Sequence, residues 1–118
     1  MATLTLKTAI GSYPHTMALK DGRVTSPRVA FDHVEFTPAN RAFRPMANDL
    51  AFDLSEMAIV TYFVAKGLGR PLTLLPVVMM CQPEFFLVVT NPGSPLHTPQ
   101  DLEGKTIGVR SYTQTTAT

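Results

Sequence analysis

Residues 52–70 read FDLSEMAIVTYFVAKGLGR, and this stretch decides the fold class. It opens with apolar residues on both sides of Asp53, a pattern that predicts a short strand. Ser55 can cap a helix after that strand, with Glu56 in the first turn, where a negative charge suits the helix dipole. Two glycines, Gly67 and Gly69, would end the helix. Its predicted apolar face consists of Met57, Ile59, Val60, Phe63, Val64 and Leu68.

The residues before this stretch repeat the alternation of strand and helix. Apolar and polar residues alternate over residues 4–10, which predicts a first strand. A polar and aromatic turn leads to a short helix at residues 16–20. A second strand is expected at residues 29–36 and a helix at residues 41–50, after a break at Pro38.

The residues after it predict further strands. Residues 72–80 form an apolar run broken only by Pro76, which predicts a buried strand, and residues 85–90 predict another. Residues 98–102 predict one capped helical turn, followed by a terminal strand at residues 105–109. The order β-α-β-α-β-α-β-β-α-β is typical of an α/β fold with a mostly parallel sheet flanked by helices.

Composition limits the class of protein. The 118 residues are 45% apolar and 16% charged, which fits one small packed domain and excludes a disordered chain. A net charge of +1 gives no electrostatic reason for a nucleic-acid or membrane partner. No apolar run approaches the roughly 20 residues of a membrane span, and the N-terminus does not resemble a secretory signal. With Met1 as the natural start we expect a cytoplasmic protein, or a periplasmic one if a signal peptide has been removed.

Common catalytic and metal-binding motifs are missing from the sequence. It contains no GxxxxGK[ST], no GxGxxG and no GxSxG element. His15, His33 and His97 stand far apart without a cysteine or carboxylate at ligand spacing, so we expect no metal site. The one cysteine, Cys81, lies in an apolar run and is expected to be a buried structural thiol.

The predicted topology gives three places for a ligand. Parallel sheets of this kind bind ligands beyond the carboxyl ends of their strands. These ends fall at residues 12–15, 53–56 and 110–115. The first two places carry the candidate ligand contacts Ser12, Tyr13, His15, Ser55 and Glu56.

Each candidate in the first two places also has a structural interpretation. His15 is either a solvated loop residue or a ligand contact and proton donor. Ser55 is a helix cap, a residue lining a ligand cleft, or both. For Glu56 we favour helix-dipole stabilisation and solvation over catalysis.

The third place is polar throughout. Arg110 directly follows the terminal strand, where it is either a partner for a ligand carboxylate or a surface arginine. The residues after it are too polar and too local to be core, which favours ligand contact; they are Ser111, Tyr112, Thr113, Gln114 and Thr115.

Three segments carry a family resemblance. They are SYPHTMAL with DGRV after the first strand, FDLSEMAIVTYFVAKG in the middle, and DLEGK followed by TIGVRSYTQTT at the end. Across residues 4–116 the chain resembles 4,5-dihydroxyphthalate decarboxylase and its relatives, a family similar to the type II periplasmic substrate-binding proteins. The DLSEM element is fairly specific for this branch, whereas DLEGK with IGV is common to substrate-binding folds in general.

The resemblance implies a two-lobed fold with a ligand cleft, of which this chain would be an incomplete first lobe. It places Tyr13 and Thr16, the Ser55-Glu56-Met57 element, Tyr112 and Thr115 at matching positions. The sequence departs from the family at His15, where the family has an acidic residue. It departs again at Arg110-Ser111, where the family has a proline and an acid.

Three functions follow as hypotheses. The first is a small-molecule carboxylate-binding lobe of a carboxy-lyase that removes CO2 from a dihydroxylated aromatic acid, with His15 as proton donor and no cofactor required. The second is a non-catalytic solute-binding protein of an ABC-type transporter. The third is an inactive fragment that needs the remainder of a longer polypeptide, a second chain, or a copy of itself to complete the fold.

Overall fold

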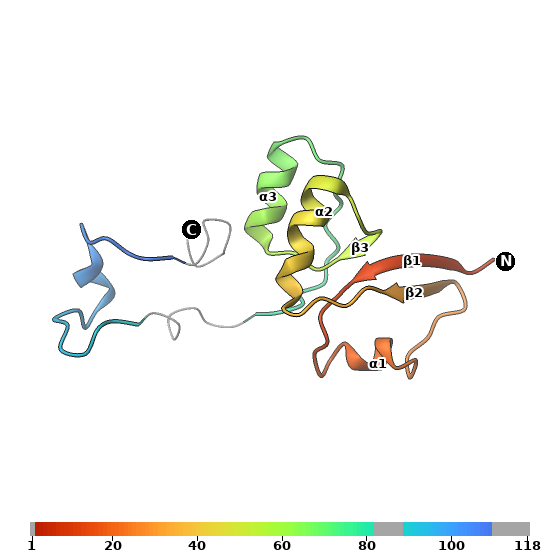
Figure 1. Ribbon diagram of the computed structural model, residues 1–118, viewed down its shortest axis with the longest axis horizontal. Coiled ribbons are helices and arrows are strands. Elements are labelled where there is room, and N and C mark those ends of the chain that lie inside the picture. Colours follow the sequence, from red (N-terminus) through yellow and green to blue (C-terminus); the bar gives the residue numbers. More distant parts are fainter. Residues whose placement is uncertain (1, 82–88, 110–118) are drawn as a thin grey trace. The chain divides into compact units, whose positions relative to one another are not determined.

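The computed structural model describes residues 2–81 and 89–109 of the chain. The chain divides into two compact units, Met1–Leu75 and Pro76–Thr118. The α/β part lies in the first unit (Figure 1). Its elements are β1 (Leu4–Ala9), α1 (Met17–Lys20), β2 (Val29–His33), the 3-10 helix η1 (Ala39–Ala42), α2 (Phe43–Asp49), β3 (Leu54–Ser55) and α3 (Ile59–Gly67).

The sheet has three parallel strands in the order β2-β1-β3. Leu4 of β1 pairs with Val29 of β2, and Ala9 pairs with Ser55 of β3. Because β1 lies in the middle, its residue Thr8 is fully buried. The prediction of an α/β chain with a parallel sheet flanked by helices is therefore confirmed for the first three predicted strands.

Two small clusters form the core of the first unit. The first contains Ala9, Ala42 and Phe52, and the ring of Phe36 meets that of Phe52 edge-on at 5.6 Å. The second is built from Ala47 of α2, Ala65 of α3 and Leu72. Because the buried helix residues are alanines, α2 and α3 can lie close together, and they run side by side in Figure 1.

The start of α3 differs from the sequence prediction. Ala58 is the residue that precedes the helix, so Ser55 does not cap it and Glu56 is not in its first turn. The reason is sheet pairing: Ser55 belongs to β3, and the backbone N–H of Glu56 still donates to the Ala9 carbonyl at 3.1 Å. The Ser55 hydroxyl donates instead to the Glu56 carbonyl at 2.8 Å.

The predicted apolar face of α3 is only partly buried. Met57 packs against the second cluster as expected, together with Tyr62, and Ala65 is the residue that α3 buries. Phe63 and Leu68, by contrast, are 61% and 76% exposed. The late start of the helix and its contact through a small residue explain why the bulky side chains face outward.

The later predicted strands are not present in the described residues. Residues 72–80 and 105–109 are not paired with a strand there, and Val78 is 78% exposed. An extended segment forms the hydrogen bonds of a sheet only with a neighbouring strand. An apolar run alone therefore does not make a strand. Cys81 is exposed, which makes the buried-thiol prediction wrong. Most of the strand predicted at residues 85–90 lies outside the described residues.

The capped turn predicted in the second unit is confirmed. It is the 3-10 helix η3 (Pro99–Leu102). The Asp101 carboxylate accepts hydrogen bonds from the N–H groups of His97 and Thr98, at 2.9 and 2.8 Å. These bonds, His97's first, hold the pKa of Asp101 below its ordinary value. Among residues 2–81 and 89–109, no helix has the length and apolar character needed to cross a membrane.

Candidate functional site

The three strands end at one edge of the sheet, and this edge holds the candidate site. We call it the carboxyl edge and define it as residues 10–16 after β1, residues 34–36 after β2, and Ser55 with Glu56 at the end of β3. The sequence placed ligand contacts in two of these segments. The structure joins those two segments directly, because Tyr13 and Glu56 are hydrogen-bonded to each other.

The turn after β1 has a fixed backbone. The buried Thr16 hydroxyl donates to the Gly11 carbonyl at 2.7 Å and accepts the N–H of Tyr13 at 2.8 Å. The Tyr13 ring lies directly on Gly11, where a Cβ atom would stand 2.5 Å from the ring carbon Cζ. A side chain at position 11 would therefore displace the Tyr13 ring from this place.

Glu56 is a buried acid with one oxygen in use. Glu56 is 8% exposed, and the Tyr13 hydroxyl donates a hydrogen bond to its Oε1 atom at 2.8 Å. Its Oε2 atom is buried and has no hydrogen-bond partner in the described residues. Burial, and then the contact with Glu56, raises the pKa of Tyr13 to about 12. The phenol is therefore a hydrogen-bond donor at neutral pH.

His15 lies beside Tyr13 as the other half of an aromatic pair. The two rings are stacked, with centroids 5.4 Å apart and an angle of 14° between their planes. His15 is exposed, whereas Tyr13 is half-buried. The pair therefore offers a flat aromatic surface to solvent, on which another ring can stack.

A second polar cluster lies at the same edge. The Lys20 ammonium contacts Glu35 Oε1 at 2.6 Å and the Ser12 hydroxyl at 2.9 Å. The Ser12 hydroxyl in turn donates to Glu35 Oε2 at 3.2 Å. The hydrogen bond from Lys20 is the main cause that holds the pKa of Glu35 below its ordinary value. Ser12, predicted as a ligand contact, is thus already tied to an ion pair.

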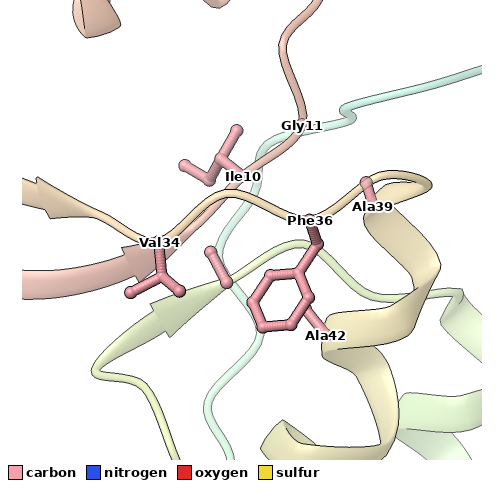
Figure 2. A pocket seen from close by; sticks show the side chains of 7 residues that line it. Ile10, Gly11, Val34, Phe36, Ala39 and Ala42 are labelled. Carbon is pink, nitrogen blue, oxygen red and sulfur yellow. The ribbon is translucent and has the colours of Figure 1, made fainter.

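An apolar hollow lies at the ends of β1 and β2, beside η1 (Figure 2). It measures about 140 Å³, including its open side. The hollow has no room for even a water molecule, so it does not enclose a ligand as it stands. The residues that line it are Ala9, Ile10, Gly11, Val34, Phe36, Ala39 and Ala42.

The predicted site residues therefore have different outcomes. Tyr13 and Glu56 are brought into contact, and His15 and Ser12 each join a neighbour at the carboxyl edge. The Ser55 hydroxyl is directed to the backbone. The remaining predicted contacts lie outside the described residues; they are Arg110, Ser111, Tyr112, Thr113, Gln114 and Thr115.

Two members of the site were not identified as candidates from the sequence. Lys20 and Glu35 are 15 positions apart, and only the pairing of β1 with β2 brings them together. Glu35 follows β2 by two positions and could have been suggested as a charged residue just after a strand, whereas Lys20 is the last residue of α1 and gives no such signal. Within residues 2–81 and 89–109, no group of three histidine, cysteine or acidic side chains is placed to hold a metal ion.

Comparison of the chain with protein-family models, with curated proteins and with solved structures gives no match. The resemblance to dihydroxyphthalate decarboxylases therefore depends on the sequence segments alone.

Proposed function

We propose that this chain is the first lobe of a small-molecule-binding protein with a type II periplasmic-binding-protein-like fold, similar to 4,5-dihydroxyphthalate decarboxylase. Its ligand would be a hydroxylated aromatic acid bound at the carboxyl edge. The observation that supports this is the Tyr13–His15 stack beside the buried Glu56, at the sheet edge where parallel folds bind ligands.

The groups at this edge suit such a ligand. The exposed face of His15 can stack on an aromatic ring, and Glu56 accepts a hydrogen bond from the phenol of Tyr13, the kind of group that a hydroxylated ligand ring carries. The ligand carboxylate was predicted to meet Arg110 and the polar residues after it. These residues lie outside the described part, so this contact remains a prediction from the sequence.

The proposed reaction is a non-oxidative decarboxylation. The bond between the ring and the carboxylate breaks, its electron pair stays on the ring carbon, that carbon takes a proton, and CO2 leaves. Ring hydroxyls make the carbon electron-rich enough to accept the proton, so the chemistry requires no cofactor. His15 is the candidate proton donor because it is exposed at the carboxyl edge. Its N–H lies in the plane of the imidazole, so in the enzyme the edge of this ring, and not its face, would point at the ring carbon that takes the proton.

The test is CO2 release from 4,5-dihydroxyphthalate and from 3,4-dihydroxybenzoate by the purified protein. We expect turnover of one of them, and we expect His15→Ala to lower kcat by about 10²–10⁴-fold, the usual contribution of a positioned proton donor. His97→Ala is the matched control, because His97 is an exposed histidine of the second unit. Full activity in His15→Ala would remove His15 from this role. Neither binding nor turnover of any aromatic acid would overturn the proposed function.

A solute-binding protein without chemistry is the second candidate. The stacked Tyr13–His15 pair favours it as much as the enzyme, because stacking binds a ring without changing it. Saturable binding of the same acids without CO2 release would decide for this candidate.

A further inference from the structure

The Oε2 atom of Glu56 is a buried acceptor to which a hydrogen-bond donor is expected to bind. A buried acceptor without a hydrogen bond destabilises the fold, and native proteins keep few such groups. Glu56 is more than nine-tenths buried, yet its Oε2 atom meets no donor in the described residues. The two ion pairs of the described part, Lys20–Glu35 and Arg23–Asp21, do not involve it either.

The partner of the other oxygen shows what this carboxyl accepts. Oε1 takes a hydrogen bond from the phenol of Tyr13, a hydroxyl carried by an aromatic ring. The hydroxyl of a hydroxylated aromatic ligand is the same chemical group. The tyrosine therefore occupies the carboxyl as such a ligand would.

The Tyr13 ring can leave without breaking the turn. The backbone is held by Thr16, through the bonds to Gly11 and to the Tyr13 N–H. The ring itself is held by its hydrogen bond to Glu56 and by its contact with Gly11. A rotation of the side chain would free the Oε1 atom of Glu56 and leave the backbone bonds in place. It would also take the Tyr13 ring off His15, so a ligand ring would replace the tyrosine both on His15 and at the carboxyl.

We infer that Glu56 is the specificity-determining residue for two adjacent hydroxyls on the ligand ring, and that Tyr13 covers this acceptor when no ligand is bound. The two carboxylate oxygens can accept two parallel hydrogen bonds from hydroxyls on neighbouring ring carbons, which makes the contact bidentate. This inference rests on the proposed function for its aromatic acid, and adds the residue and the isomer that are recognised.

The experiment compares three probes by titration calorimetry with the intact protein. They are 3,4-dihydroxybenzoate, its isomer 3,5-dihydroxybenzoate, whose hydroxyls are not adjacent, and benzoate. We expect the 3,4-isomer to bind about tenfold more tightly than the 3,5-isomer, which corresponds to one or two hydrogen bonds. Glu56→Gln should abolish this preference, because the amide replaces one acceptor by a donor. Asp32→Asn, which removes an exposed carboxylate on β2, should leave it unchanged.

A second variant, Tyr13→Phe, is expected to raise the affinity for the 3,4-isomer. Tyr13→Phe keeps the ring but removes the internal hydroxyl that competes for Glu56. The affinity for the 3,4-isomer, taken relative to that for benzoate, should then rise about 2–10-fold. This arm remains decisive if Glu56→Gln does not fold. Weaker binding of the 3,4-isomer to Tyr13→Phe would overturn the inference.

The two possible failures can be distinguished. Equal affinity for the two dihydroxybenzoate isomers, or an unchanged preference in folded Glu56→Gln, overturns the role of Glu56 and leaves the proposed function standing. If none of the three probes binds, the proposed function fails and this inference fails with it.

Discussion

Glu56 and Glu35 stand at the same edge of one sheet, yet their surroundings differ in almost every respect. Glu35 has a side chain that is 58% exposed and lies against the ammonium of Lys20. Glu56 is 8% exposed, accepts one neutral hydroxyl and leaves its second oxygen without a partner. Water and a cation solvate the first carboxyl at little cost. Burial of the second carboxyl with an unpaired oxygen destabilises the folded protein. This destabilisation is our reason to assign Glu56 to ligand recognition.

The largest expected effect comes from replacing the buried carboxyl by an apolar group of similar size. Exchange of an incompletely paired buried polar group for an apolar one is often stabilising. Glu56→Met should therefore raise the free energy of unfolding by about 1–3 kcal/mol while it abolishes binding of dihydroxylated acids. Urea unfolding and calorimetry measure the two effects. A loss of stability of this size would show that Glu56 is kept for the fold and would contradict the comparison.

The next effect concerns Tyr13 at alkaline pH. Its pKa in the folded protein is about 12, above the ordinary value of 10.0. The stabilisation from its protonated form is therefore complete below pH 10 and lost as the pH rises toward 12. After allowance for solvent screening of a half-buried group, we expect a loss of about 1 kcal/mol in wild type relative to Tyr13→Phe. Urea unfolding at pH 9 and pH 12 measures it, and parallel pH curves for the two proteins would contradict it.

A smaller effect is expected at the exposed carboxyl. Ion pairs that reach solvent contribute about 0–1 kcal/mol, so Glu35→Gln should lower stability at pH 7 by about 0.5 kcal/mol. The pKa of Glu35 is lowered in the folded protein, so this contribution is present above its ordinary value of 4.5 and lost as the pH falls below it. Thermal unfolding at pH 7 and pH 3 checks both points. An effect as large as that of Glu56→Met would remove the contrast between the two carboxyls.

The smallest effect is local and lies in the second unit. Asp101→Ala removes the acceptor of the His97 and Thr98 N–H groups. We expect faster hydrogen exchange at these two amides and no change in the thermal unfolding of the first unit. Unchanged exchange at both amides would show that the capped turn does not depend on Asp101.

Local patterns predicted the elements that depend on local contacts. Alternation predicted β1, apolar residues predicted β2, and the sequence TPQDL predicted η3 with its cap. The parallel arrangement followed from the order of elements, because parallel strands need crossovers. The contact between Tyr13 and Glu56 could be anticipated from the same rule, since both follow a strand.

The errors arose where a distant partner decides the structure. Ser55 has the chemistry of a helix cap, but pairing with Ala9, 46 positions earlier, draws it into a strand. Residues 72–80 are apolar enough for a strand and have no strand beside them in the described part. The role of Lys20 depends likewise on Glu35, which β2 brings near. Such long-range pairings leave no periodic signal in one sequence.

The most direct test of the central claim is a map of backbone amide shifts by nuclear magnetic resonance during titration with 3,4-dihydroxybenzoate. Ligand binding at the carboxyl edge predicts the largest changes within the first unit at Gly11, Tyr13 and Glu56, with little change at the start of β1. Saturable binding that leaves these three amides unchanged would contradict the claim that the carboxyl edge is the binding site.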